Sequence, residues 1–306
     1  MKTSSNGTAR PVVRPHLSLA RTQIPAQSPT TSRVERALTT AVERMTATGC
    51  PPTLAAALRY SVFPGGSRLR PSLCIAVARA CGDVNPAVTD GAAAALELLH
   101  CASLVHDDLP AFDDSPLRRG RPSVHAAFGE AIAVLSGDAL LIGAFETLAF
   151  AGDRAPGTFA ALTRLLTRAA GSPFGMCSGQ AWESEDDVDL VRYHRAKTAS
   201  MFEAATMAGA LSAGVDPEAW RELGCAVGEA YQVADDIRDR VGGADLGKPV
   251  GRDEAKDRPS AVRSFGLDDA RRLLRQHAAN AVARIPDCAG REELVERISQ
   301  MLRAFS

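Results

Sequence analysis

The chain has 306 residues, which is long enough for a single large domain with a sizeable buried core. Its formal net charge is −1, so the composition argues against a general affinity for nucleic acid or for an anionic membrane surface. Seven widely spaced cysteines form no CxxC pair, as is typical of free thiols in a reducing compartment, and no run of 18 apolar residues predicts a transmembrane helix. We therefore expect a cytoplasmic protein without stable membrane insertion.

The N-terminal segment differs in composition from the rest of the chain. Residues 1–30 contain no acidic residue, are rich in Ser, Thr, Pro and Arg, and lack the apolar stretch of a secretory signal. This composition predicts a disordered tail, although an organelle transit peptide has the same composition. We therefore divide the chain into a tail over residues 1–30 and one domain over residues 31–306.

From Ser32 onward, Ala-rich amphipathic segments follow one another, with Gly and Pro between them. They predict helices over roughly 32–48, 52–60, 68–80, 86–107, 122–136, 137–151, 157–170, 173–182, 188–213, 217–241, 267–284 and 290–304. Aromatic residues are only 5% of the chain and no segment alternates with period two, so the pattern indicates an all-α domain. Residues 242–262 are polar and rich in Gly and Pro, which predicts a functional lid or loop.

The first candidate site follows the predicted helix 86–107. Within thirteen residues lie four carboxylates and two guanidinium groups: Asp107, Asp108, Asp113, Asp114, Arg118 and Arg119. Carboxylates this close repel one another unless a cation lies between them, and Mg²⁺ prefers carboxylate oxygen. The arginines match the geometry of a diphosphate that such metals carry. A solvated acidic loop beside a basic turn is the alternative interpretation.

The helix that precedes this segment carries a polar stripe. His100, Ser103 and Asp107 recur at spacings of three and four and so share one face, and Pro110 ends the helix. A single histidine on an apolar helix is usually a core residue. His100 differs because its stripe leads directly to the carboxylates.

A second aspartate cluster ends the predicted helix 217–241. Asp235 and Asp239 are four residues apart and lie on one face, with Asp236 beside them. The negative end of the helix dipole makes this an unfavourable place for carboxylates. Two such helix ends predict opposed aspartate faces with Mg²⁺ between each face and a phosphate group.

Positive groups occur near both clusters. A Gly-Gly turn precedes Arg68 and Arg70, a pattern that suits close approach to an anion but equally an ordinary basic start of a helix. Lys197 and Lys248 are two of only four lysines, and each could also be a plain surface residue. Gln232 is a polar residue on an apolar helix face and needs a partner if it is buried.

Together these motifs resemble a known family. The combination of GGSRLRP, HCASLVHDDLPAFDDSPLRRG, KT at 197–198, and YQVADDIRD followed by LGK resembles the trans-polyprenyl diphosphate synthases, particularly bacterial geranylgeranyl diphosphate synthases of carotenoid and bacteriochlorophyll pathways. The resemblance runs from about residue 30 to the C-terminus. It implies an isoprenoid synthase helical bundle with a central cavity and a homodimer. It also implies head-to-tail condensation of isopentenyl diphosphate with an allylic diphosphate.

The resemblance also implies roles for individual residues. About three Mg²⁺ ions would be bound with the allylic diphosphate by six carboxylates: Asp107, Asp108, Asp113, Asp235, Asp236 and Asp239. The allylic diphosphate itself would be contacted by Arg118, Lys197, Thr198, Gln232 and Lys248. The isopentenyl diphosphate would be bound by Arg70, His100 and Arg119. The aspartates and Lys197 would form the catalytic set.

The residues just before the first motif bear on product length, and position 67 departs from the family pattern. Family members that stop at farnesyl diphosphate tend to carry an aromatic residue just before the first motif, whereas this chain has Ala102 and Ser103, which favours the C20 product. A side chain five residues before the motif lies roughly 7–8 Å deeper along the helix. The first motif is lengthened to DDxxxxD by Pro110 and Ala111, as in bacterial enzymes. Ser67 stands where many relatives have lysine, and Arg68 or Arg70 could compensate.

Two alternatives stay open at this point, and a third is disfavoured. The first is a farnesyl or longer-chain synthase. The second is a non-catalytic subunit of a heteromeric synthase, which the missing lysine at position 67 motivates. A terpene cyclase is disfavoured because the second motif is DDIRD.

Overall fold

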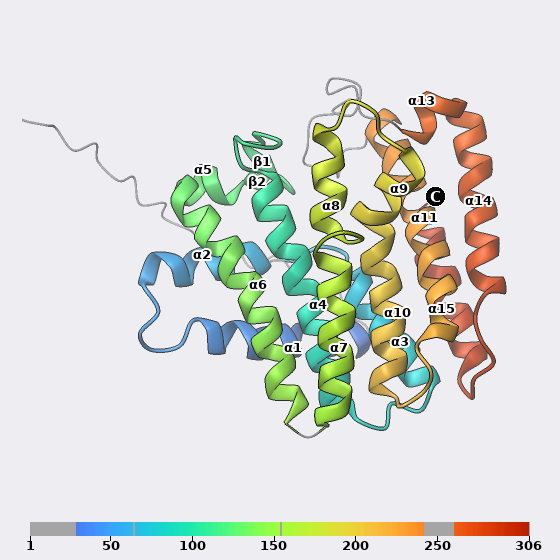
Figure 1. Ribbon diagram of the computed structural model, residues 1–306, viewed down its shortest axis with the longest axis horizontal. Helices are drawn as coiled ribbons and strands as arrows, with labels where there is room; N and C mark the ends of the chain where they lie inside the picture. Colours follow the sequence, from blue (N-terminus) through green and yellow to red (C-terminus); the bar gives the residue numbers. More distant parts are fainter. Residues whose placement is uncertain (1–28, 64, 154, 242–259, 306) are drawn as a thin grey trace, which may run out of the picture.

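The computed structural model describes residues 29–63, 65–153, 155–241 and 260–305. In chain order its longer helices are α1 (Pro29–Met45), α2 (Pro52–Val62), α3 (Leu69–Ala80), α4 (Pro86–Asp107), α6 (Glu130–Gly152), α7 (Pro156–Ala170), α10 (Ser200–Ser212), α11 (Arg221–Val241), α14 (Leu267–Ala283) and α15 (Arg291–Arg303). Shorter helices and turns are α5 (Val124–Phe128), α8 (Met176–Ala181), η1 (Trp182–Ser184), α9 (Leu190–His194), η2 (Arg195–Ala199), η3 (Glu218–Trp220) and α13 (Ala261–Phe265). The prediction of an all-α fold is confirmed (Figure 1).

Helix α4 is the centre of the bundle. It packs most extensively on α6 and also contacts α1, α3 and α10 (Figure 1). Helix α10 is the second inner helix and contacts α3, α7 and α11. Both helices are apolar nearly all round, which is the pattern expected for helices buried on every side. The candidate site residues at the end of α4, and those on the turn η2 that leads into α10, are therefore carried by the buried inner helices.

Close helix contacts depend on small residues. A Cβ atom at Gly209 of α10 would lie 2.4 Å from the carbonyl oxygen of Cys74 in α3, and one at Gly224 of α11 would lie 2.5 Å from Cα of Glu203. Only glycine allows these backbones to approach so closely. The starts of α2, α4 and α7 each carry proline in the first turn, where its missing N–H costs nothing.

Several helix boundaries differ from the sequence prediction. The predicted break between 122–136 and 137–151 is wrong, because the chain breaks earlier, at Gly129 with φ 89°. Gly137 lies within α6, and the ring of His106 occupies the place that a Cβ atom at this position would take. The single helix predicted over 188–213 consists of α9, the π-helical turn η2 and α10.

A two-residue antiparallel hairpin interrupts the helical pattern. Strands β1 (Leu117–Arg118) and β2 (Arg121–Pro122) are joined by Arg119 and Gly120, which both have positive φ values of 53° and 72°. Such a turn matches the twist of a tight hairpin. Two residues per strand are too few to produce an alternating sequence pattern, so the hairpin was not predicted.

Two helices are long and apolar enough, by length and composition alone, to cross a membrane. They are α4, whose most apolar window is 78% buried inside the protein, and α6, whose window is 44% buried. Helix α4 is thus a core helix, whereas α6 combines a buried face with an exposed apolar one. The boundary predicted between a tail and a domain stays a prediction, since residues 1–28 lie outside the described part of the chain.

Candidate active site

The loop after α4 folds back on the end of the helix. The backbone N–H of Asp113 donates to the carbonyl oxygen of Asp107 at 2.9 Å, and that of Ser115 donates to the carbonyl oxygen of Asp108 at 3.1 Å. Asp114 has a positive φ of 46°, which allows this reversal. The inserted residues of DDxxxxD thus form a compact turn that ties the backbone of Asp113 to that of Asp107.

The two adjacent aspartates have different environments. Asp108 is only 2% exposed, and both of its oxygens accept hydrogen bonds from Arg118, at 2.6 Å from Nε and 2.7 Å from Nη2. This bidentate pair orients Arg118 and directs both oxygens of Asp108 toward the guanidinium group. Asp107 is half-buried, and burial together with Asp113 and Glu183 raises its pKa, against the opposing effect of Lys197 and Arg118. The turn after α4 therefore presents Asp107 and Asp113, with Arg118 held beside them.

The second aspartate motif also contains one buried, hydrogen-bonded aspartate next to a more exposed one. Asp236 is buried and accepts hydrogen bonds from Gln232 Nε2 at 2.8 Å and from the backbone N–H of Ala261, at the start of α13, at 2.7 Å. Thr198 donates to Gln232 Oε1 at 2.6 Å, so the polar residue singled out on α11 has two partners. Asp235 is exposed, and Arg238, one turn further along the helix, lies 3.7 Å from it.

Lys197 lies on the π-helical turn η2 and forms an ion pair with Glu183, the middle residue of η1. The Tyr193 hydroxyl donates to the same carboxylate at 2.7 Å. A Cβ atom at Gly179 would lie 2.3 Å from the backbone nitrogen of Lys197, so α8 packs tightly against this turn. The contributions of Glu183 and Tyr193 were missed in the sequence, because neither belongs to a recognisable motif.

A cluster of positive groups lies beside the carboxylates. Arg70 is only 7% exposed, and its guanidinium carbon lies 4.5 Å from the ring centroid of Phe202 and 5.7 Å from that of Tyr231. Among the described residues Arg70 forms no ion pair, and its Nε has no hydrogen-bond partner. Burial and the nearby guanidinium groups, above all Arg70 and Arg119, hold the pKa of His100 well below its usual range, so His100 is neutral. An unpaired buried cation is costly, so this cluster is suited to an anionic ligand.

The Gly-Gly turn separates two arginine roles. The Arg119 side chain packs against Gly66, where a Cβ atom would lie 2.4 Å from Nη2. Arg68 is instead buried in an ion network, donating to Glu97 at 2.7 Å, to Glu35 at 2.8 Å and to the carbonyl oxygen of Val62. Arg68 therefore holds α1, α2 and α4 together and is not available to replace the lysine missing at position 67. Arg70 is the arginine that remains free to do so.

Three other predicted positions can be placed or set aside. Ala102 is completely buried, whereas Ser103 is half-buried and donates from Oγ to the carbonyl oxygen of His100 at 2.9 Å. Of the two, Ser103 shares the face of His100 and Asp107. Lys248 lies outside the described residues.

The donor set fits a divalent cation that is bound together with a ligand. Within the described part of the chain, no three His, Cys, Asp or Glu side chains are grouped to hold a metal ion by themselves. Mg²⁺ usually takes one or two carboxylates from the protein and completes its shell with water and substrate phosphates. Separate carboxylates on α4, its following turn and α11 match this pattern.

Comparison with known proteins gives consistent matches. The chain matches the polyprenyl synthetase family over residues 51–298. It is 51% identical over 267 residues to the geranylgeranyl diphosphate synthase of Rhodobacter capsulatus, covering 87% of this chain and 92% of that protein. The geranylgeranyl diphosphate synthase of Cereibacter sphaeroides is 50% identical, with 87% and 93% covered. The farnesyl diphosphate synthase of Geobacillus stearothermophilus is 39% identical, with 80% and 84% covered.

Solved structures also resemble this fold. A geranyltransferase from Helicobacter pylori complexed with magnesium and isoprenyl diphosphate superposes with a TM-score of 0.76 at 26% identity, covering 92% of this chain and 100% of that one. A polyprenyl synthase from Caulobacter crescentus complexed with calcium and isoprenyl diphosphate gives a TM-score of 0.72 at 27% identity, covering 91% and 99%.

Proposed function

The chain is a member of the polyprenyl synthetase family, and we propose that it condenses isopentenyl diphosphate with allylic diphosphates to form geranylgeranyl diphosphate. The observation that carries this proposal is the juxtaposition of two kinds of site. Asp235, a carboxylate suited to a metal-bound diphosphate, interacts electrostatically with a buried arginine, Arg70, that has no ion-pair partner among the described residues. The 50–51% identity to two geranylgeranyl diphosphate synthases supports the choice of product.

The allylic diphosphate would bind between the ends of α4 and α11. Asp107, Asp113, Asp235 and Asp239 would present carboxylate oxygens to about three Mg²⁺ ions, while Asp108 and Asp236 position neighbouring residues. The chemistry that bound Mg²⁺ supplies is neutralisation of the charge that develops on the departing diphosphate. Relatives solved with magnesium or calcium and isoprenyl diphosphate support the use of a divalent cation.

Five side chains would contact the leaving diphosphate. Arg118 is already oriented by Asp108, so it loses little conformational freedom when it binds an oxygen of the diphosphate. Lys197 would exchange its ion pair with Glu183 for the diphosphate, and Thr198 and Gln232 would complete this side. Lys248 is assigned to the same diphosphate by the family resemblance alone.

The isopentenyl diphosphate would occupy the cluster of Arg70, Arg119 and His100. Arg70 is held in place by two aromatic rings, and the neutral imidazole of His100 can donate one hydrogen bond without adding charge. The C–O bond of the allylic substrate then breaks, the double bond of isopentenyl diphosphate attacks the freed carbon, and a proton passes to the released diphosphate. The residues act mainly through positioning and electrostatic stabilisation.

The product is assigned as C20 because the face of α4 below Asp107 carries a small residue, Ser103, beside the small and buried Ala102. Incubation of the purified protein with labelled isopentenyl diphosphate and each allylic primer, followed by measurement of product length, tests this assignment. A dominant C15 product would identify a farnesyl diphosphate synthase instead. Absence of activity in the isolated protein would favour the non-catalytic subunit.

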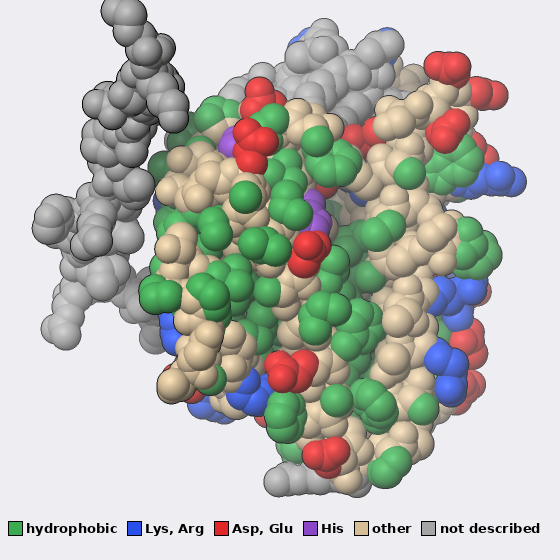
Figure 2. Space-filling model, turned by 60° about the vertical axis from the view of Figure 1, so that its left-hand side comes forward, with side chains coloured by type: hydrophobic (Ala, Val, Ile, Leu, Met, Phe, Trp, Pro, Cys, Tyr) green, Lys and Arg blue, Asp and Glu red, His purple; other side chains and the backbone are tan. Residues whose placement is uncertain are grey.

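The protein is proposed to act as a homodimer through α6. Exposed apolar side chains form a stripe along this helix: Val134, Leu135, Ile142 and Phe150. The face in Figure 2, which brings forward the side where α2, α5 and α6 lie, carries many hydrophobic side chains. An apolar stripe of this kind is a candidate interface. The bacterial relatives and the free cysteines support a soluble, cytoplasmic enzyme.

The dimer can be tested with a matched pair of substitutions. Ile142 and Val84 are both 71% exposed, but Val84 lies in the connection between α3 and α4 and not on α6. Sedimentation velocity of Ile142→Glu should give a monomer, and Val84→Glu should remain a dimer. An interface through α6 would be contradicted if both variants were monomers, or if both remained dimers.

A further inference from the structure

We propose that this protein has a second ligand site, distinct from the aspartate clusters, which binds an anionic amphiphile: an apolar chain with a phosphate, diphosphate or carboxylate head. The site is a cavity of about 600 Å³ bounded by α7, η1, α9, η2, α10 and the first residue of α11. This volume lies within the range of small-molecule sites, about 300–1,000 Å³. None of the residues assigned to substrate or metal lines it.

One part of the cavity wall is apolar. Ala204 and Met207 of α10 are buried side chains that face the cavity, and Leu165 and Ala169 of α7 lie opposite them. Trp182 of η1 adds an aromatic surface. Such a wall binds a hydrocarbon chain by removing apolar surface from water.

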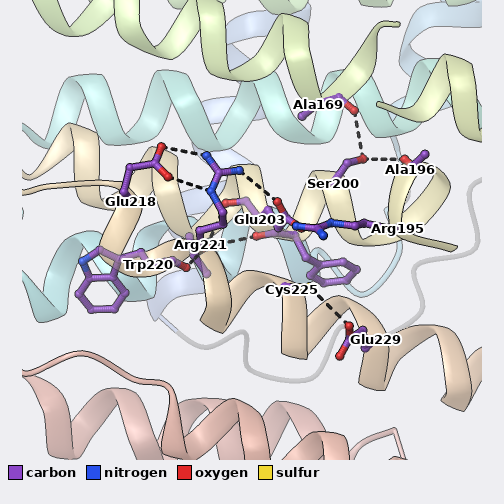
Figure 3. A network of polar contacts seen from close by, with 12 residues as sticks. Ala169, Arg195, Ala196, Ser200, Glu203, Glu218, Trp220, Arg221, Cys225 and Glu229 are labelled. Atoms are coloured by element: carbon purple, nitrogen blue, oxygen red, sulfur yellow. Dashed lines mark hydrogen bonds and ion pairs between the residues drawn. The ribbon is translucent and has the colours of Figure 1, made fainter. Parts of the chain in front are cut away.

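The remaining wall is strongly basic. It contains four arginines, which come from α7, α9, η2 and α11: Arg168, Arg192, Arg195 and Arg221. The only carboxylate in the lining is Glu203, which is 7% exposed. Arg221 Nη1 and Arg195 Nε each lie 3.3 Å from a different oxygen of Glu203 (Figure 3). Glu203 therefore fixes two arginines at the cavity but neutralises only one charge.

Several guanidinium groups keep free donors. Arg221 is the most engaged of the four, because Nε and Nη2 donate to Glu218 and Nη1 donates to Glu203. Arg168 is exposed, makes no ion pair among the described residues, and places its guanidinium carbon 4.1 Å from the ring centroid of Phe174. Arg192 meets Asp189 only through Nε, at 3.4 Å. The four arginines carry four positive charges, and the carboxylates of Glu203, Asp189 and Glu218 balance three of them. One positive charge therefore remains for an anion.

The chemistry of the lining selects the ligand class. Arginine forks match the geometry of phosphate and carboxylate, and the apolar wall requires a chain attached to that head. The cavity also adjoins the catalytic lysine. Trp182 and Ala196 line the cavity, and each is followed in the chain by one member of the Glu183–Lys197 ion pair. A ligand that contacts Trp182 or Arg195 therefore acts next to Lys197.

The test separates this cavity from the catalytic site by removing Mg²⁺. Trp182 and Trp220 are the two tryptophans of the chain, so the Trp220→Phe variant makes Trp182 the only tryptophan reporter. Its fluorescence is titrated in EDTA with farnesyl diphosphate, palmitate, farnesol or inorganic diphosphate. We expect saturable binding of one farnesyl diphosphate or one palmitate per chain. Whichever of these two ligands binds more tightly shows whether the site prefers a diphosphate or a carboxylate head group. Farnesol alone and diphosphate alone should each bind at least tenfold more weakly.

Substitutions assign the binding to the cavity. Arg168→Gln and Arg192→Gln should each weaken binding about tenfold or more, since each removes charge-assisted hydrogen bonds. The matched control is Arg164→Gln, an exposed arginine one turn earlier on α7 that does not line the cavity. The proposal is overturned if no ligand binds in EDTA, or if the Arg168 and Arg192 variants bind like the Arg164 control. It is also overturned if binding is lost in Arg70→Met but retained in Arg168→Gln, because the ligand would then occupy the catalytic site.

Discussion

The Asp108–Arg118 pair allows a direct test of how the first aspartate motif works. Replacing Asp108 by Asn removes the negative charge but keeps the shape of the side chain, so Arg118 loses its ion-pair partner. Asp108 is 2% exposed and the pair is bidentate, at 2.6 and 2.7 Å. We therefore expect a large loss of stability, in contrast to a typical surface substitution.

The magnitude follows from burial. Breaking a buried pair by removing one partner costs about 3–5 kcal/mol, and Arg118 retains some access to solvent, so the lower end of about 3 kcal/mol applies. For a chain of this size that loss corresponds to a fall in the melting temperature of about 6–12 °C. In a double-mutant cycle with Arg118→Gln, the coupling free energy should be about 1–3 kcal/mol.

Substitution of the neighbouring Asp107, in contrast to that of Asp108, should not lower the stability. Burial raises the pKa of Asp107, so its ionised form costs stability increasingly as pH rises from the unfolded pKa through the folded pKa. Asp107→Asn removes this cost at neutral pH and should leave the melting temperature unchanged or higher, while abolishing Mg²⁺-dependent activity. Asp114→Asn is the matched control, because Asp114 is exposed and asparagine tolerates its positive φ. Its melting temperature should stay near the parent value.

The assay is thermal and urea unfolding in EDTA, followed by circular dichroism, with product formation measured in parallel in Mg²⁺. The reasoning is refuted if Asp108→Asn melts within about 2 °C of the parent protein while activity is lost, because the effect on stability predicted from burial would then be absent. A coupling free energy near zero would likewise refute it. Either result would return Asp108 to the role of a direct metal ligand.

Three further predictions address the substrate side of the site. Arg70→Met should raise the KM for isopentenyl diphosphate about 10–100-fold without loss of stability, since the guanidinium is buried with no ion-pair partner among the described residues. Steady-state kinetics measure the KM and a melting curve measures the stability. A destabilised variant would contradict the conclusion that Arg70 is unpaired. The pKa of His100 in the folded protein lies below its unfolded value of about 6.5, so the stability that neutral His100 contributes is complete above pH 6.5 and is lost as pH falls. The free energy of unfolding of His100→Gln should therefore fall less between pH 7 and 5 than that of the parent protein. Parallel curves of stability against pH would show that His100 does not contribute to this pH dependence. Ser103→Phe should shift the main product from C20 to C15 in a chain-length assay, and an unchanged product would remove α4 from the control of chain length.

Much of the fold could be predicted because its signals are local. Apolar periodicity identified the long helices, and proline in the first turns marked several of their starts. The boundary placed at Gly137 failed for a tertiary reason, because the glycine there serves packing against His106 and the real break is at Gly129. A glycine that permits a turn and a glycine that permits close packing look the same in a sequence.

The sequence alone also determined which residue types gather at the site. Clustered aspartates near the ends of two helices indicated a metal-bound anion, since carboxylates repel one another at any such spacing. Only the tertiary structure decided what each charged group does. It pairs Asp108 with Arg118, buries Arg68 with Glu97, and leaves Arg70 between two aromatic rings. Partners such as these lie far apart in the chain or across a turn, and their choice depends on how the helices pack. The cavity of four arginines has the same origin, because it exists only where α7, α9, η2 and α11 meet.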